Sequence, residues 1–397
     1  MSSPNWHEIR QQILFDPTVT YLNTGSYGLL PKVVYEELCA MRDRMFRDPT
    51  DFLWRSGMPR LWVARQRTAN FLGVTPANLI FTANVSVSIN IVGSALRLAA
   101  PGEILTTDQE YGSMKWVWER AAARQGLTLR TMALPMQAKD PDEVAAAILN
   151  ELRPTTRLLF LSHVYYTCGI VLPVAKICAE ARRRGVLTMI DGAHAPGMLP
   201  LNLTEVGADF YAANLHKWLL APLGAGFLHV APGREDMLQP LQVSWGWHYD
   251  RKLADTPDLF GGTPRLRSFE FEGSRDITPW LAMPTVLDFH QSLGIDTIRQ
   301  RHFELSDYVR QKLSDTGGLT CVTPSHADLR GGLTSFRLPP HDAHAVRRVI
   351  WGKYRFEVNL VEHPESGNYF RVSTHFYNMP EEIDRLAGII PEAFPRA

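Results

Sequence analysis

Two apolar, strand-like runs that each end beside a charged side chain constrain this chain more than any other feature. The run 185–190 is followed by Asp191, and the run 209–215 is followed by His216 and Lys217. In an open α/β sheet, residues that follow parallel strands converge on one crevice outside the carboxyl ends of those strands. A lone lysine there is usually a solvated amine, and a lone aspartate usually a helix cap. The two in this order, each with a histidine nearby, are much more specific than either alone.

The pair Asp191 and Lys217 indicates a pyridoxal phosphate (PLP) site. A PLP enzyme needs a lysine amine that forms an imine with the cofactor's aldehyde, and a carboxylate that keeps the pyridine nitrogen protonated. Lys217 and Asp191 supply these two groups. A lysine desolvated beside a pyridinium has a lowered pKa, so the freed Lys217 amine is also the nearest base for proton transfer at the substrate Cα.

A phosphate cradle is expected where the predicted strand 78–82 turns into the predicted helix 85–98. Backbone N–H groups and the positive end of the helix dipole face an anion at such a turn. The candidate phosphate ligands are Asn84, Val85, Ser86 and His216. The segment alone favours the simpler interpretation that Asn84 or Ser86 caps the helix.

Strand-like runs alternate with helical patterns between about residues 60 and 235, which is typical of parallel βαβ units. Further strands are expected at 103–107, 127–134 and 157–161, and further helices at 113–125, 140–152 and 174–184. The segment 240–273 is rich in Gly, Pro and Trp and is expected to be a linker or active-site loop.

Beyond that segment the pattern changes, with helices expected at 277–293 and 296–314 and mixed strands and helices through 333–394. The sequence therefore predicts an α/β fold whose large domain has a mostly parallel sheet flanked by helices, with a smaller C-terminal α+β domain. The expected division is an N-terminal segment that packs with the small domain, a PLP-binding large domain and the small domain, over residues 1–60, 61–273 and 274–397.

Composition and charge fit a globular enzyme. Hydrophobic residues make up 45% of the 397-residue chain and charged residues 21%, which is ordinary for a folded protein. The 41 basic and 41 acidic residues balance, so neither a nucleic-acid nor a membrane partner is expected. The chain shows no signal-peptide pattern, no apolar run near the ~20 residues of a membrane helix and no C-x-x-C spacing. We therefore expect a cytoplasmic protein.

Other classes of protein have weaker support. A zinc hydrolase needs H-E-x-x-H or clustered Cys and His, and a serine hydrolase needs G-x-S-x-G; neither pattern occurs, so no metal is expected. The pair Gly224 and Gly226 lacks the third glycine and the helix of a dinucleotide site. A PLP-binding transcriptional regulator would need an added basic DNA-reading module, for which the ~60 residues before the large domain leave no room.

Six short motifs occur in order: N-T-G-S-Y-G from Asn23, T-A-N-V-S from Thr82, D-Q-E-Y from Asp108, D-G-A-H-A-P-G from Asp191, H-K-W-L-L-A-P from His216 and E-G-S-R-D from Glu272. Over nearly the whole chain they resemble the class V aminotransferase family, and within it the isopenicillin N epimerase-like proteins. The resemblance implies a fold type I PLP enzyme that forms a homodimer with active sites at the subunit interface.

The same resemblance implies roles for single residues. Tyr111 would stack on the pyridine ring, His194 would hydrogen-bond the cofactor's phenolic oxygen, and Ser274 would reach the phosphate of the other subunit. Asn23 and Tyr27, from the first motif, are expected near the substrate.

Arg371 is expected to hold the substrate α-carboxylate. It lies in the strand-like segment 369–373, where a guanidinium needs an anionic partner, and its planar fork suits a carboxylate. The alternative is an internal ion pair with one of the chain's own carboxylates.

Two departures from the epimerase pattern leave the reaction type open. The segment 162–169 reads S-H-V-Y-Y-T-C-G where the pattern has Thr-Gly after Ser-His-Val, and Asn214 stands where Ser or Gly is frequent. Tyr165 and Tyr166 are either core aromatics or walls of the substrate pocket, and Cys168 is either a packing thiol or a weak acid near the substrate. The resemblance implies chemistry at Cα of an amino acid or aminoacyl-bearing substrate in bacterial antibiotic metabolism, with epimerisation as the expected outcome. C–S β-elimination and decarboxylating oxidative deamination, as in lincosamide pathways, are the alternatives.

Overall fold

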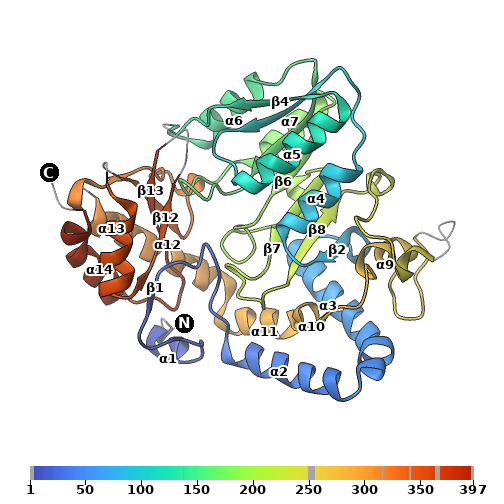
Figure 1. Cartoon of the computed structure of the whole chain (residues 1–397), viewed down its shortest axis with the longest axis horizontal. Helices are drawn as coiled ribbons and strands as arrows, with labels where there is room; N and C mark the ends of the chain where they lie inside the picture. Colours follow the sequence, from blue (N-terminus) through green and yellow to red (C-terminus); the bar gives the residue numbers. More distant parts are fainter. Residues whose placement is uncertain are drawn as a thin grey trace.

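The structure, a computed structural model, describes residues 4–136, 138–248, 255–314, 316–338, 341–362 and 367–394. Its centre is a seven-stranded sheet with the strand order β2-β8-β7-β6-β5-β3-β4 (Figure 1). The strands are β2 (Leu79–Thr82), β3 (Glu103–Thr107), β4 (Thr128–Met132), β5 (Thr156–Ser162), β6 (Leu187–Asp191), β7 (Phe210–Asn214) and β8 (Gly226–Val230). Strands β4, β3, β5, β6 and β7 run parallel, and β8 is antiparallel to both of its neighbours. The predicted α/β class with a mostly parallel sheet is confirmed.

Apolar side chains cover both faces of this sheet, because successive residues of a strand point to opposite sides. In β5, Leu158 and Phe160 join the core beneath α4 and α5, whereas Leu159 and Leu161 join the core formed with α3, α6 and α7. Burial on both faces explains why the strand sequences are continuous apolar runs. The helices around the sheet are α3 (Gly57–Leu72), α4 (Val85–Ala95), α5 (Gly112–Gln125), α6 (Pro141–Asn150), α7 (Val174–Arg183), α8 (Leu203–Val206), α9 (Pro264–Glu270), α10 (Thr278–Leu281) and α11 (Met283–Leu293).

A smaller unit follows with its own hydrophobic core. Its antiparallel sheet has the order β12-β13-β10-β9, and α12 and α14 pack together beside it (Figure 1). The elements are α12 (Ile295–Leu313), β9 (Thr320–Cys321), β10 (Leu333–Arg337), α13 (Ala343–Arg347), β11 (Phe356–Glu357), β12 (Asn359–Val361), β13 (Tyr369–Ser373) and α14 (Pro380–Ala393).

The N-terminal segment contacts both units. Near its start, α1 (Trp6–Arg10) is tied to α14 by an ion pair of 2.7 Å between Arg10 and Glu382, and β1 (Thr20–Tyr21) pairs with β11. Farther on, α2 (Lys32–Arg47) lies against α10 and α11 below the large sheet (Figure 1). The division at residues 60/61 and 273/274 stays a prediction.

Most expected elements of the large sheet are confirmed, with small shifts at their ends. The strand expected at 103–107 is β3, and the helix expected at 113–125 is α5, which ends at Gly126 with a φ of 66° that favours glycine. The expectation of an irregular segment over 240–273 is wrong at its end, because α9 forms there with Thr263 as its N-cap. Residues 249–254 of that segment lie outside the described residues.

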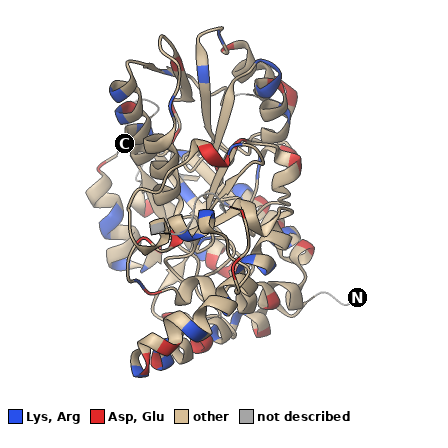
Figure 2. Ribbon diagram, turned by 90° about the vertical axis from the view of Figure 1, so that its right-hand side faces the viewer, with Lys and Arg blue, Asp and Glu red and all other residues tan. Residues whose placement is uncertain are grey.

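In the described part of the chain, no helix is long and apolar enough to cross a membrane. Basic and acidic residues are interspersed over the helices in the view of Figure 2 rather than separated by sign.

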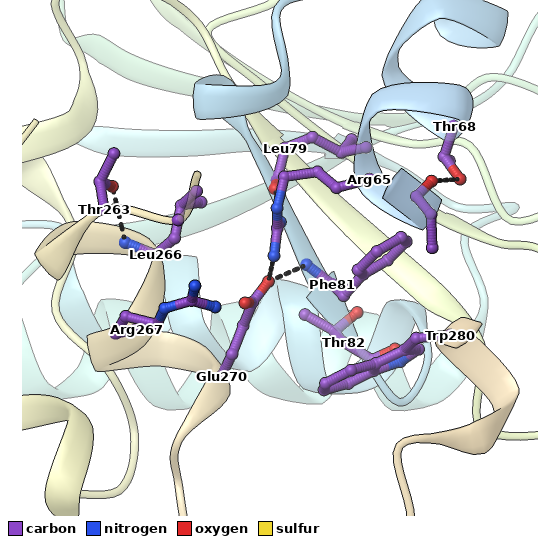
Figure 3. A network of polar contacts seen from close by, with 12 residues as sticks. Arg65, Thr68, Leu79, Phe81, Thr82, Thr263, Leu266, Arg267, Glu270 and Trp280 are labelled. Atoms are coloured by element: carbon purple, nitrogen blue, oxygen red, sulfur yellow. Dashed lines mark hydrogen bonds and ion pairs between the residues drawn. The ribbon is translucent and has the colours of Figure 1, made fainter. Parts of the chain in front are cut away.

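A buried ion pair fixes the edge strand β2 to its surroundings (Figure 3). The side chains of Arg65 and Glu270 are 0% and 1% exposed, and they join α3 to α9. Glu270 Oε1 also accepts the Phe81 amide at 3.2 Å, while Arg65 donates to the Leu79 carbonyl. The ion pair thus binds one edge of the strand that leads to the phosphate-cradle candidates, and β8 pairs with the other edge.

We expect Glu270→Leu to lower the free energy of unfolding by about 3–5 kcal/mol, because Arg65 would be left charged and unpaired in the core. Asp43→Ala is the control, since it breaks the exposed Arg47–Asp43 pair on α2 and should leave the urea midpoint nearly unchanged. Urea titrations followed by circular dichroism measure both. Similar small shifts in the two variants would contradict a supporting role for the buried pair.

Candidate active site

The ends of three adjacent strands form the floor of a cavity. Ser162, Asp191 and Asn214 are the last residues of β5, β6 and β7, and the strand register places Ser162 directly beside Asp191. Together with loops and the small unit they enclose a cavity of about 700 Å³. Its walls include the sequence-predicted residues Tyr27, Asn84, Val85, Ser86, Tyr111, Tyr166, Asp191, His194, His216, Lys217 and Arg371.

Four sequence-predicted residues do not line this cavity in the described structure. Tyr165 and Cys168 are fully buried; the Tyr165 hydroxyl is 3.1 Å from Thr107 Oγ1 and from Glu110 Oε1, and burial raises the pKa of the Cys168 thiol to about 12. Asn23 lies behind the wall, where its side chain contacts Arg371. Ser274 is exposed, away from the cavity of its own chain. The roles assigned to these four from the sequence stay predictions.

The Lys217 amine is held in a largely desolvated place. Its Nζ lies 3.1 Å from His194 Nε2, and among the described residues no carboxylate forms an ion pair with it. Burial and the nearby Arg371 lower the pKa of Lys217 to about 7, although the negative charge of Asp191 opposes both. A large fraction of the amine is therefore neutral, and so nucleophilic, near neutral pH.

Trp218 sets the direction of the hydrogen bond between His194 and Lys217. The Trp218 indole N–H donates to His194 Nδ1 at 3.2 Å, and an indole has no acceptor, so Nδ1 must be unprotonated. Burial holds the pKa of His194 well below its usual value, so the ring is neutral with its proton on Nε2. His194 Nε2 is therefore the donor in its hydrogen bond with Lys217, and the neutral Lys217 amine is the acceptor.

Asp191 presents one free oxygen to the cavity. Its Oδ1 accepts the Ala193 amide at 2.8 Å, and the other oxygen accepts no hydrogen bond from the described residues. Burial raises the pKa of Asp191 to about 6, while the Ala193 amide and the Lys217 charge lower it. A cationic N–H brought to the free oxygen would favour the ionised form.

The N-terminus of α4 faces the same cavity. Asn84 is its N-cap, with its side chain accepting the Val87 amide at 3.1 Å, and Asn214 Oδ1 accepts the Val85 amide at 2.9 Å. The side chain of Asn84 therefore caps the helix, as the simpler interpretation expected, and its oxygen is occupied by that bond. Ser86 lines the cavity, and no hydrogen bond from its amide or its hydroxyl is found among the described residues. Free donors at a helix N-terminus suit a phosphate.

Arg371 is buried without an anion. Its guanidinium donates to Tyr166 O, Asn23 Oδ1 and Ser26 Oγ at 3.0–3.1 Å, and its Nε has no partner. In the described chain no internal carboxylate pairs with it, which leaves the charge available to a ligand. Burial lowers the pKa of Arg371 to about 10, so the guanidinium remains charged at neutral pH.

A close backbone contact fixes the N-terminal loop over the lysine. The Gly28 amide donates to His216 O at 2.9 Å, and a Cβ at Gly28 would lie 2.0 Å from Lys217 O, so only glycine fits. The contact also brings the Tyr27 ring to 6.0 Å from the His216 ring in a stacked arrangement.

The arrangement fits PLP. It combines a neutral, enclosed lysine amine, a carboxylate with one free oxygen, and unpaired donors at a helix N-terminus. Sequence reasoning missed Trp218 and Glu110, and it missed the wall formed by Asn359, Val361 and Glu362 of the small unit. The position of Trp218 next to the lysine was a usable signal, whereas the small-unit residues gave none.

Comparisons with known proteins agree with this geometry. The family model described as Aminotransferase class-V matches residues 57–386. The chain belongs to the class V aminotransferase family. It is 48% identical over 395 residues to isopenicillin N epimerase of Streptomyces clavuligerus, covering 98% of both chains. It is 47% identical over 397 residues to isopenicillin N epimerase of Amycolatopsis lactamdurans, covering 99% of both.

Solved structures support the fold and the cofactor. A complex of the cystine C–S lyase C-DES with its product cysteine persulfide has a TM-score of 0.81 and 27% identity, over 94% of this chain and 97% of that one. A C-DES variant with glycine covalently linked to its PLP cofactor has a TM-score of 0.82 and 27% identity, over 96% and 98% of the two chains. The protein is thus a PLP-dependent enzyme of fold type I.

In Trp218→Phe we expect the His194 proton to be shared between Nδ1 and Nε2. The variant keeps an aromatic ring but loses the indole N–H that donates to Nδ1. Nitrogen NMR of the imidazole should show one tautomer, protonated at Nε2, in the unaltered protein and a mixture of tautomers in the variant. Trp280→Phe is a matched control, because that buried indole donates to Thr82 O instead. A single unchanged tautomer in Trp218→Phe would contradict the assignment.

Proposed function

We propose that this enzyme epimerises the Cα centre of an amino acid or aminoacyl-bearing substrate, with Lys217 as the base. The observation that carries the proposal is the 48% identity, over nearly the full chain, with an enzyme named isopenicillin N epimerase. The same relatives support a place in bacterial antibiotic metabolism.

PLP supplies an aldehyde that captures amines and a ring that takes up the electron pair of Cα. Lys217 then removes the Cα proton, for which a pKa of about 7 suits its amine at neutral pH. Arg371 binds the substrate carboxylate and so orients Cα. The free oxygen of Asp191 would keep the ring nitrogen of PLP protonated, and the Nε2–H of His194 would hydrogen-bond the phenolic oxygen.

Inversion needs a second acid on the other face of Cα, and two neighbouring tyrosines of the cavity wall are candidates for it. Tyr111 and Tyr166 both line the cavity, with their rings 5.2 Å apart in an edge-to-face contact. Burial raises the pKa of Tyr166, so its hydroxyl keeps the proton it would have to deliver.

A C–S β-lyase is the second candidate, and the similarity to the cystine C–S lyase C-DES favours it. Such a reaction needs only one base, and Lys217 is sufficient for that role. Decarboxylation has less support, because a charged Arg371 without an internal anion is suited to retaining the substrate carboxylate.

We also propose that the enzyme is a cytoplasmic homodimer with shared active sites. Support comes from three cavity residues that are more than half exposed in the single chain, namely Tyr27, Tyr111 and Leu223. A second subunit over the open side would bury them, and the exposed Ser274 of that subunit would be free to approach the phosphate site.

Product analysis distinguishes the reactions. The enzyme is incubated in deuterium oxide with an L-aminoadipyl peptide and, separately, with an S-substituted cysteine conjugate. We expect the α-epimer with deuterium at Cα from the first substrate and no loss of carbon or sulfur from either. Ammonia with pyruvate would instead establish the lyase, and an aldehyde with carbon dioxide would establish decarboxylation.

Two variants test the residue roles. Lys217→Ala should abolish the visible absorption of lysine-bound PLP and the exchange of the Cα proton. Asp191→Asn should keep PLP bound but lower kcat by about 100-fold or more, because an amide cannot hold the ring nitrogen protonated. Near-normal turnover of Asp191→Asn, or a retained visible band in Lys217→Ala, would refute the corresponding assignment.

A further inference from the structure

Glu110 is a buried carboxyl group beside the cavity, and none of the steps above uses it. It lies just after β3, is 3% exposed, and contacts Ser162, which lines the cavity next to Asp191. In the described chain no lysine or arginine forms an ion pair with it. A buried carboxyl without a cation is unusual enough to need an explanation.

The two oxygens of Glu110 have different surroundings. Oε1 is surrounded by three donors: the Ser162 amide at 3.2 Å, the Thr107 hydroxyl at 3.1 Å and the Tyr165 hydroxyl at 3.1 Å. Oε2 has one contact, the Ser162 hydroxyl at 2.5 Å. A serine hydroxyl and a protonated carboxyl can each donate, so the short Oε2–Oγ contact can hold a proton from either side while Oε1 accepts. What favours the neutral acid is the burial of Glu110 without a cation among the described residues.

A second acid lies close by. The charge of Asp191 acts on Glu110 and disfavours a second negative charge there. The hydroxyls of Ser162, Thr107 and Tyr165 contact it, and Tyr166, whose pKa is raised by burial, lies near enough to interact with its charge. Burial is a larger cause than Asp191, and together the two raise the pKa of Glu110 to about 8. When two neighbouring acids sit in environments that differ this way, one keeps the proton and the other ionises.

We propose that Glu110 is the protonated member of the pair, that its proton bonds Ser162 Oγ, and that the Ser162 hydroxyl proton is thereby directed into the cavity beside Asp191. Glu110 is then a positioning residue, and Ser162 is a hydroxyl donor to a group bound in the cavity, at the strand end next to that of Asp191. The use of that donor by PLP rests on the proposed function, whereas the proton on Glu110 is a property of the cofactor-free protein.

Glutamine is the natural mimic of this state. In Glu110→Gln the amide oxygen can accept the three donors and the NH₂ group can donate to Ser162 Oγ, with no charge at any pH. If Glu110 were ionised instead, the same substitution would set an NH₂ group against the Ser162 hydroxyl proton. Glu110→Leu has a side chain of similar size that can neither accept from the three donors nor donate to Ser162 Oγ.

The first test uses infrared spectra of the cofactor-free protein carrying carbon-13 at its glutamate side-chain carboxyls. We expect one labelled carboxyl that remains protonated at pH 7, ionises near pH 8, and is missing in Glu110→Gln. Because only glutamate carboxyls carry the label, Asp191 does not contribute to the labelled signal. The variant assigns the signal to Glu110, whereas the overturning result comes from the wild-type titration and does not depend on how the variant folds. Complete ionisation of all labelled carboxyls at pH 7 would overturn the proposal.

The second test is the pH dependence of unfolding. Between the ordinary pKa of 4.5 and the folded value of about 8, the folded protein binds one more proton at Glu110 than the unfolded chain, so this contribution to stability falls as the pH rises. The free energy of unfolding of Glu110→Gln, taken relative to wild type, should therefore increase across that window. A flat difference above pH 5 would overturn the proposal.

PLP affinity supplies the third readout. We expect Glu110→Gln to bind PLP within about twofold of wild type and Glu110→Leu about tenfold more weakly, since only the former keeps the Ser162 contact. Equal losses in both variants would overturn the proposal. Failure of the proposed epimerase activity would leave the infrared and unfolding results unaffected, so the two failures are distinguishable.

Discussion

A lysine amine that must stay largely neutral inside the protein is the constraint on which the active site depends. Lys217 has lost most of its hydration, and no carboxylate among the described residues pairs with it directly. The groups around it compensate in other ways: the imidazole of His194 offers a donor to the neutral amine, and Asp191 lies near enough to limit the fall of the Lys217 pKa. Desolvation therefore has two effects on Lys217: burying the amine costs free energy, and the same loss of water lowers its pKa and makes it nucleophilic.

The charges of the cavity have opposite effects on stability as the pH changes. The pKa of Lys217 falls from 10.5 to about 7, so the unfolded chain binds more protons there and this contribution to stability rises with pH across that interval. Glu110 has the reverse sign between 4.5 and about 8, and Asp191 has it between 3.8 and about 6. These effects oppose one another only between about pH 7 and 8, where the neutral amine and the neutral acid are both well populated.

The sequence predicted the parts of this site that depend on strand ends. Asp191 and Lys217 follow apolar runs, and parallel strands place such residues at one edge whatever the distance between them in sequence. The antiparallel β8 was not predicted, because its glycine start was considered only as a possible dinucleotide motif. The position of Trp218 next to the lysine indicated that it lies near the site but not which group it bonds. Its bond to His194, and those of Glu110 to Ser162 and Tyr165, join residues 24–55 positions apart, which no local pattern reports.

The remaining question is how a substrate anchor on the small unit is kept in register with a base on the large sheet. The N-terminal loop supplies the connection, because its short segment 23–28 touches both. At one end, Asn23 bonds Arg371, and its backbone pairs with Ser373 of β13. At the other end, Gly28 lies against the carbonyl of Lys217 at a distance that excludes any side chain. Five peptide units between these contacts leave little freedom, so a loop that belongs to neither sheet determines the separation of Arg371, the proposed carboxylate anchor, and Lys217, the proposed base.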